Sequence, residues 1–283
     1  ARDLSGFQYP EYFGKALFSG RYVNKGYTLE KYLVPGSGDY MLPAVLFKPL
    51  ENQKKEVVLF LHGKGMEQAA LEDSLTIHSM VQDGYAVLLF DVPGIGSLGP
   101  GYLRGDAYID NTSFNQWFAG ILTNRSIVGM RAEDILRITH FAESDPGGFE
   151  TISALAWGAG GSEMLHAAVF HESIQKLILV QPFLSYAEIA TNPEYEPAFI
   201  PSTVAGAIEK YDLPDLMAAL CSRKLMIINP LAANGDPAGD SEKTCHLSYP
   251  GIVFTQKGVK DHFKLASSVE GRQVYEQVLK CLR

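Results

Sequence analysis

The feature that most constrains the fold is a repeated alternation of short apolar runs with amphipathic stretches. The apolar runs predict buried strands over residues 56–62, 85–91, 150–157, 176–182, 224–230 and 251–256. Helical patterns lie between or after them, over residues 68–82, 127–141, 162–170 and 269–282. Strands that are apolar on both faces and alternate with helices are typical of a mostly parallel sheet with helices on both sides. The sequence therefore predicts the α/β fold class.

The remaining segments are arranged around this alternation. Residues 1–26 are rich in aromatic residues and glycine, and we expect them to form an N-terminal arm. We expect residues 27–283 to form a single domain that starts with an antiparallel hairpin, because GSGDY between two strand-like runs suits a tight turn. Two segments, at about 97–125 and 183–215, interrupt the alternation and predict lid-like insertions.

Composition narrows the possible functions. The chain has 283 residues, of which 46% are hydrophobic, and this is enough for one large core. A net charge of -8 without any run of Lys or Arg argues against a nucleic-acid partner. No apolar stretch of about 18 residues predicts a membrane-spanning helix, so no membrane partner is expected. The chain starts without Met or an apolar signal core, and we interpret it as a mature or excised fragment.

Neither a metal nor a cofactor is expected from the sequence. The three cysteines, Cys221, Cys245 and Cys281, form no CxxC motif, which argues against a zinc site. Free thiols and one disulfide with one thiol left over are both compatible with their spacing. No HxH or HExxH motif accompanies the histidines, and GAGG lacks the further residues of phosphate-binding and dinucleotide-binding loops.

The stretch LAWGAGGSEM, residues 155–164, lies between a predicted strand and a predicted helix. Together with the His-Gly pair that ends strand 56–62 and PGIGSLG after strand 85–91, it resembles the α/β-hydrolase superfamily over nearly the whole chain. The segments NRSIVGMRAEDILR and YDLPDLMAAL are most similar to the bacterial group of acetyl xylan esterases and dienelactone hydrolases. The resemblance implies an α/β-hydrolase fold and an ester-hydrolysing ancestry.

In that superfamily the strand-to-helix turn, or nucleophile elbow, reads G-x-S-x-G, with small residues two positions on either side of the nucleophile. Ala156 and Gly160 satisfy this requirement, but the central position is Gly158. Glycine accepts a positive φ without strain and has no side-chain oxygen, so the resemblance implies an elbow without its nucleophile. Ser162 is better interpreted as a cap of the following helix, and Ser97 follows the wrong strand.

The resemblance also implies an oxyanion hole and a base. Backbone donors for the oxyanion are expected around Lys64 and Gly65 and at Ala159. A histidine after the last strand would be the base, and His262 is the candidate. A surface histidine in a polar loop explains His262 equally well, so both interpretations stay open.

The acid of the triad is expected after strand 224–230. Asp236 is a weak candidate there, and Asp240 and Glu188 are alternatives. Each of them also fits an ordinary solvated loop carboxylate. Since the members of a triad orient and activate one another, an absent nucleophile and an uncertain acid together predict that serine catalysis is lost.

We therefore predict a carbohydrate-esterase-like domain that is non-catalytic or very weak as a serine hydrolase, with a binding or accessory role. Aromatic residues of the insertions, such as Trp117 and Phe199, fit either lid packing or a carbohydrate cleft. The expected partners are a carbohydrate or small acyl ligand and an adjacent catalytic domain of a longer chain, and the resemblance implies a secreted or periplasmic location.

Whether the chain is an enzyme stays open in the sequence. The first alternative is an active ester hydrolase of the acetyl esterase type, in which His262 activates water directly. The second alternative is a small-molecule receptor that uses the same cleft without hydrolysis. A substrate class that comes from resemblance alone is a weak basis for function.

Overall fold

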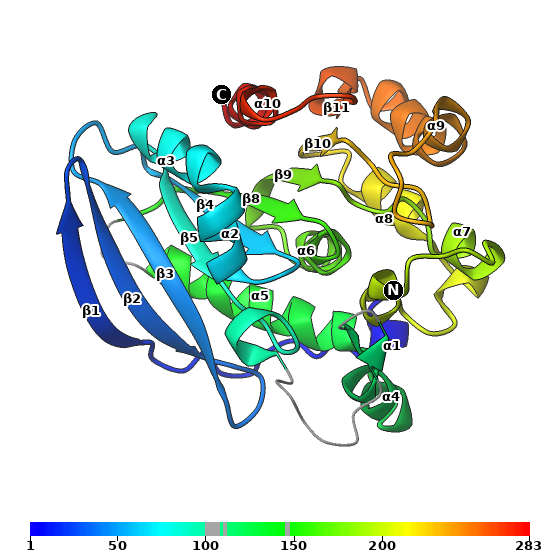
Figure 1. Cartoon of the computed structure of the whole chain (residues 1–283), viewed down its shortest axis with the longest axis horizontal. Coiled ribbons are helices and arrows are strands. Elements are labelled where there is room, and N and C mark those ends of the chain that lie inside the picture. Colours follow the sequence, from blue (N-terminus) through cyan, green and yellow to red (C-terminus); the bar gives the residue numbers. More distant parts are fainter. Residues whose placement is uncertain (100–107, 110–111, 145–147) are drawn as a thin grey trace.

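The structure is a computed structural model that describes residues 1–99, 108–109, 112–144 and 148–283 (Figure 1). Its main sheet has the order β1-β2-β3-β5-β4-β8-β9-β10-β11. Strands β1 to β3 and β5 pair antiparallel, and β5, β4, β8, β9, β10 and β11 pair parallel. The strands are β1 Leu17–Asn24, β2 Tyr27–Pro35, β3 Met41–Pro49, β4 Glu56–His62, β5 Ala86–Phe90, β8 Thr151–Trp157, β9 Ile174–Val180, β10 Lys224–Ile228 and β11 Phe263–Ala266.

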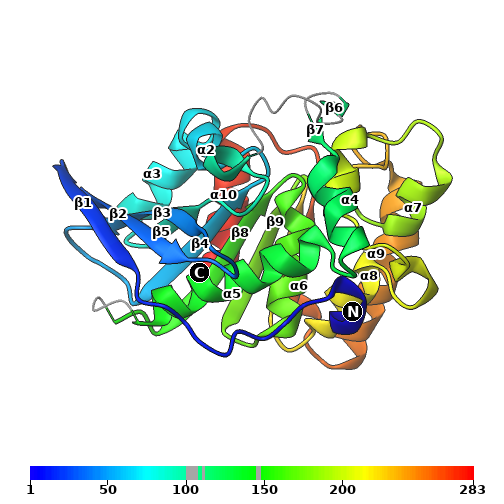
Figure 2. The same ribbon diagram turned by 90° about the horizontal axis from the view of Figure 1, so that it is seen from below.

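Helices cover both faces of this sheet (Figures 1 and 2). Helices α2, α3 and α10 pack on one face, and α5, α6, α8 and α9 belong to the core of the other. The α-helices are α1 Arg2–Ser5, α2 Met66–Glu72, α3 Ser74–Gln82, α4 Asn115–Leu122, α5 Ile127–Ser144, α6 Gly160–Phe170, α7 Tyr186–Thr191, α8 Leu213–Ala219, α9 Asp240–Gln256 and α10 Arg272–Leu282. Short 3₁₀ helices are η1 Gly96–Leu98, η2 Pro197–Ser202, η3 Ala207–Glu209 and η4 Lys260–His262, and β6 Tyr108–Ile109 pairs with β7 Thr112–Ser113 in a separate ribbon.

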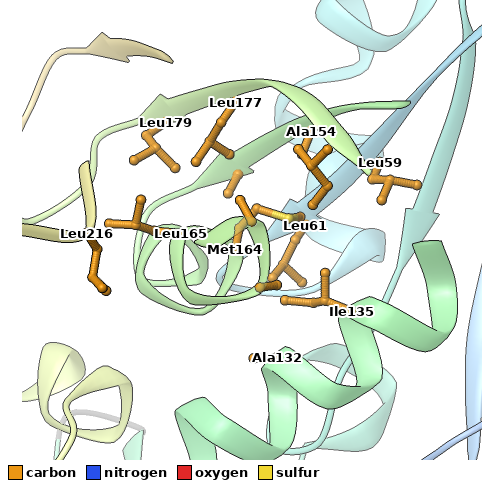
Figure 3. Close-up of a cluster of buried hydrophobic side chains, with 14 of the residues drawn as sticks. Leu59, Leu61, Ala132, Ile135, Ala154, Met164, Leu165, Leu177, Leu179 and Leu216 are labelled. Atoms are coloured by element: carbon orange, nitrogen blue, oxygen red, sulfur yellow. The ribbon is translucent and has the colours of Figure 1, made fainter. Parts of the chain in front are cut away.

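The central strands are buried on both faces because their side chains alternate between two cores. In β4, Leu59 and Leu61 belong to the core under α5 and α6, whereas Val58 and Phe60 belong to the core under α3 and α10. Figure 3 shows α6, which carries Met164, packed beside the leucines of the neighbouring strands. Each fully buried leucine contributes about 1.5–3 kcal/mol, so the sheet holds the ends of its strands in place.

The α/β-hydrolase fold class predicted from the sequence is confirmed by this architecture. The hairpin of strand-like runs is also confirmed, as β2 and β3 pair from Tyr27↔Pro49 to Pro35↔Met41. Part of the predicted N-terminal arm extends the sheet, because residues 17–24 form the edge strand β1. Within the described residues, no helix has both the length and the apolar character needed to cross a bilayer.

The predicted strand at 251–256 is wrong, because these residues end helix α9. Leu247, Pro250 and Phe254 are its buried residues, and their spacing of three and four is helical, whereas the short apolar run alone fits either structure. The last strand is instead β11, a short edge strand.

Other elements differ less from prediction. The helix expected over 68–82 is interrupted at Asp73, which separates α2 from α3. The second insertion holds α7, η2 and η3, and α8 starts at its end. In the first insertion, η1, β6, β7 and α4 are seen, and residues 100–107 and 110–111 lie outside the described part of the chain.

Candidate functional site

The turn between β8 and α6 has the geometry of a nucleophile elbow. Gly158 follows Trp157 at the end of β8 with a φ of 64°, and its N–H donates to the Val180 carbonyl at 2.9 Å. A Cβ at Gly160 would lie 3.1 Å from Leu61 Cγ, so a larger residue at this position would force Leu61 to shift. A Cβ at Gly158 would meet no atom within 4 Å, so a side chain at the apex would enter open space.

That open space belongs to a cavity of about 720 Å³ at the carboxyl ends of the parallel strands. The cavity is formed by the elbow, the loop after β4, the turn after β5, the start of α5 and the second insertion. Its lining includes His62, Gly63, Lys64, Glu72, Gly96, Gln116, Arg131, Trp157, Gly158, Ala159, Gln181, Phe199, Ser202 and Leu231. The volume falls within the range of small-molecule sites, about 300–1,000 Å³.

A fixed guanidinium lies in the wall of this cavity. Arg131 is only 4% exposed, and its NH1 donates to Glu163 Oε1 at 2.6 Å while its Nε donates to the Pro93 carbonyl at 2.8 Å. The Ser202 hydroxyl donates to the same Glu163 oxygen at 2.8 Å, which ties the second insertion to α6. The buried pair therefore fixes three segments around the elbow rather than presenting a mobile charge.

His62 has a protein group near each ring nitrogen, but only Nδ1 is within hydrogen-bond distance. Its Nδ1 accepts the Lys64 N–H at 3.1 Å, so the proton is on Nε2, which lies 3.6 Å from Asp73 Oδ2. Burial lowers the pKa of His62 to about 4 and raises the pKa of Asp73 to about 6. His62 is thus neutral near pH 7, and its acceptor nitrogen is already used, so it has no lone pair for general-base chemistry.

Of the three residues expected to provide oxyanion donors, Lys64 and Ala159 line the cavity and Gly65 does not. The Lys64 N–H donates to the His62 ring, and the Gly65 N–H donates to the His62 carbonyl at 2.9 Å. Ala159 lines the cavity, and no acceptor for its N–H is found among the described residues. A Cβ at position 63 would lie 3.0 Å from the Ala159 nitrogen, so Gly63 packs directly against the elbow.

The structure does not bring His262 to the elbow. His262 ends η4, just before β11, and β11 runs parallel to β10, β9 and β8. It therefore lies at the amino-terminal edge of the sheet, whereas Gly158 lies at the carboxyl edge. The expected position after the last strand holds Ser267, Ser268 and Val269 instead of a histidine. The prediction is wrong because residues 251–256 end helix α9, so His262 precedes the last strand, β11, and does not follow it.

None of the candidate acids lines the cavity. Asp236 is exposed, and its Oδ2 accepts the Asn234 amide at 2.7 Å. Asp240 is also exposed and pairs with Lys243 at 2.8 Å. The carboxylate predicted after β10 is thus not found at the elbow in the described structure.

Glu188, the third candidate acid, contacts the loop after β10 and helix α9. Its Oε1 accepts the Ala233 N–H at 3.1 Å, and its Oε2 lies 3.3 Å from His246 Nε2. These contacts join the second insertion to the loop after β10 and to α9. Glu188 therefore holds this loop rather than facing the elbow.

An amide joins the loops in which the acid and the base were expected. Asn229, directly after β10, donates from Nδ2 to the Val269 carbonyl at 2.6 Å and accepts the Val269 N–H on Oδ1 at 3.1 Å. Both bonds connect the loop after β10 to the loop after β11. Sequence reasoning missed Asn229, because a single amide at a strand end carries no signal of its tertiary partner.

The two candidate serines have other partners. Ser162 is buried inside α6 with its hydroxyl 2.7 Å from the Tyr186 hydroxyl, so the expectation that it caps the helix is wrong, and Ala159 holds the N-cap position. The Ser97 hydroxyl donates to Asp91 Oδ2 at 2.7 Å, on the turn after β5. Neither serine occupies the apex of the elbow.

The aromatic residues of the insertions differ in their relation to the cavity. Phe199 is buried against Phe183, with ring centroids 4.9 Å apart, and also lines the cavity. Trp117 packs on Phe114 and Phe118 instead. All three cysteines are free. Among the described residues, no group of three or more His, Cys, Asp or Glu is arranged to hold a metal ion.

Comparison with family models and with curated proteins finds no match. Solved structures of esterases do match: a proposed acetyl xylan esterase from Bacteroides fragilis has a TM-score of 0.74 at 15% identity, with 94% of this chain and 72% of that chain covered. A glucuronoyl esterase from Solibacter usitatus has a TM-score of 0.65 at 12% identity, with 96% of this chain and 86% of that chain covered. An acetyl xylan esterase from Paenibacillus sp. R4 has a TM-score of 0.62 at 18% identity, with 98% of this chain and 89% of that chain covered.

At these identities the likeness establishes the fold. The chain has the α/β-hydrolase fold, and the turn that its sequence predicted as the elbow lies at the junction of β8 and α6.

Proposed function

We propose that this chain is a carbohydrate-esterase-like domain that binds its ligand at the elbow without serine catalysis. The observation that supports this most is Gly158, which stands at the apex of a well-formed elbow and leaves open space where a nucleophilic side chain would be. The elbow faces a cavity large enough for a sugar unit or a small acyl group.

The surroundings of the apex support the same proposal. Hydrolysis by a triad needs a nucleophile, a base that removes its proton and a group that orients the base. Gly158 has no proton to give, and His62 uses its acceptor nitrogen for the Lys64 N–H. A rigid wall that includes Ala159 and Arg131 suits binding, because polar groups fixed in advance cost little entropy on association.

The proposed ligand is a carbohydrate or a small acyl compound. Support comes from the names of the matched structures, acetyl xylan and glucuronoyl esterases, and from the apolar ring of Phe199 in the wall. An accessory role beside a catalytic domain of a longer chain is part of this proposal.

Calorimetric titration with acetylated xylo-oligosaccharides tests the proposal. We expect saturable binding without release of acetate, and we expect Gly158→Asn to weaken it at least tenfold, because asparagine tolerates a positive φ and would fill the open space. Gly258→Asn is the matched control, since Gly258 has a φ of 75° and an equally open Cβ direction away from the cavity.

Two results would contradict the proposal. One is steady release of acetate by the wild-type chain. The other is equal binding by Gly158→Asn and Gly258→Asn, because it would place the ligand away from the elbow.

A further inference from the structure

A second cavity, of about 980 Å³, adjoins the first at the carboxyl ends of β9, β10 and β11. It lies between α3 and α10, and the loop after β11 forms part of its wall. Glu72, Trp157, Gln181 and Leu231 line both cavities, so the two hollows meet at these side chains. The polar and aromatic side chains of this second cavity have no part in the function proposed at Gly158.

The unusual group is the carboxyl of Asp73, at the break between α2 and α3. Asp73 lines the second cavity and is only 6% exposed. Its Oδ2 is buried and has no hydrogen bond among the described residues, and its side chain does not cap α3 although it holds the N-cap position. A buried carboxylate without hydrogen bonds or a paired cation is energetically costly.

His62 does not serve as the counter-charge of Asp73 near pH 7. Its Nε2 lies 3.6 Å from Asp73 Oδ2, which is beyond hydrogen-bond length. Burial keeps the pKa of His62 at about 4, so the ring is neutral, while the pKa of Asp73, at about 6, leaves that carboxyl ionised above this pH. The ionised carboxylate therefore faces a neutral ring.

The other charges of the cavity do not compensate Asp73 either. Glu72 and Glu270 add negative charge to the wall. Lys243 pairs with Asp240 at 2.8 Å, and Arg272 has an 86% exposed side chain near Glu276. Burial and the charge of Glu72 raise the pKa of Asp73, and the ammonium of the exposed Lys64 offsets only part of this rise. The cavity is thus acidic where Asp73 lies.

Trp157 adds an aromatic surface beside these carboxylates. Its Nε1 donates to Gln181 Oε1 at 2.9 Å, which fixes the indole while the ring lines both cavities. The face of an indole attracts a cation at close range, and the attraction grows as water is excluded.

We infer that the second cavity binds a small ligand that carries a primary ammonium group, which donates to Asp73 and lies against Trp157. A quaternary ammonium would supply the charge but no N–H donor for the Asp73 carboxyl. The site is separate from the ligand proposed at Gly158, and neither depends on the other.

The test uses two probes of the same shape, cyclohexylammonium and cyclohexanol, titrated at pH 8 into the full chain and followed by ligand-observed NMR and calorimetry. We expect the ammonium probe to bind at least tenfold more tightly, because a hydrogen bond to a charged group is worth about 1.5–3 kcal/mol, or about 10- to 100-fold. Asp73→Asn should reduce its affinity to the level of cyclohexanol, and Glu270→Gln, at the exposed rim, should change it less than threefold.

Three outcomes would overturn the inference: no saturable binding of cyclohexylammonium, equal affinity for both probes, or equal losses in Asp73→Asn and Glu270→Gln. Folding of the variant is checked by its thermal midpoint at pH 8, which should not fall below wild type because an uncompensated buried charge is removed. Binding of xylo-oligosaccharides at the elbow should be unchanged in Asp73→Asn, which separates this test from that of the proposed function.

Discussion

The turn between β8 and α6 and the loops after β10 and β11 lie at the same edge of the sheet, but they differ from the esterase pattern in different ways. At the turn, the backbone has the positive φ expected of an elbow at Gly158, and Gly160 packs on Leu61. In the loops, the structure shows a contact that the pattern does not predict, the Asn229 amide on Val269.

This difference has a physical reason. The loop after β4, strand β8 and helix α6 approach closely, so a Cβ at Gly63 or Gly160 would force its neighbours to shift by a few tenths of an ångström whether or not a reaction takes place. The loops after β10 and β11 are instead joined by the two bonds between Asn229 and Val269, which need an amide and neither an acid nor a base. Close packing thus sets the shape of the turn, whereas hydrogen bonds join the loops.

The largest loss in the free energy of unfolding is expected from breaking the buried ion pair of Arg131 and Glu163, beside the elbow. Glu163→Ala leaves Arg131, 4% exposed, without its carboxylate, and should lower the free energy of unfolding by about 3–5 kcal/mol. Urea denaturation measures this loss. The matched surface variant Glu276→Ala removes a mostly exposed partner of Arg272 and should cost less than about 1 kcal/mol.

A smaller loss in the free energy of unfolding is expected when the pH is lowered, because His166 in α6 becomes protonated. His166 is fully buried, its Nε2 lies 3.0 Å from the Tyr211 hydroxyl, and burial lowers its pKa to about 4. Because the unfolded histidine titrates near 6.5, its share of stability is complete above that pH and is lost as the pH falls towards 4, by up to about 3 kcal/mol. Denaturation of wild type and His166→Gln from pH 7.5 to 4 should show a shallower pH slope in the variant, and equal slopes would contradict this.

On the loop side, Asn229→Ala removes both bonds to Val269. We expect a loss of about 1–3 kcal/mol in the free energy of unfolding and faster amide hydrogen exchange at Val269. Unchanged exchange in this loop would show that the Asn229 amide does not hold it. The loops after β10 and β11 would then not be joined by this amide, as the comparison with the turn assumes.

The smallest stability effect is expected at the apex itself. Gly158→Ser should cost about 1 kcal/mol, since a non-glycine residue at positive φ is strained although its side chain enters open space. We expect no gain in aryl acetate hydrolysis over Gly258→Ser, because the serine would lack a base. A clear gain in rate would show that the loops do supply a base, and would break the comparison.

Most of the fold could be predicted because the central strands are apolar on both faces. The segment 56–62 was predicted at its true bounds as β4. The edge strand β11 was missed because it has four residues, of which Lys264 and Leu265 are exposed, so no buried pattern marks it. This single error moved the candidate base, His262, to the wrong end of the sheet.

The site could be predicted only where it depends on backbone shape. Gly158 and the small residues around it are visible in the sequence because the elbow is local. Arg131 and Glu163 are 32 positions apart, and their pairing depends on how α5 packs beside α6. The break at Asp73 and its approach to His62 likewise depend on tertiary contacts, which no local pattern predicts.

The most direct test of the central claim, that the elbow has no nucleophile, is the intact mass of the chain after exposure to a fluorophosphonate serine probe. We predict no adduct on the folded wild-type chain, because the apex is Gly158 and the hydroxyls of Ser97 and Ser162 are bonded to Asp91 and Tyr186. A stoichiometric adduct on any serine of the folded chain would contradict the account.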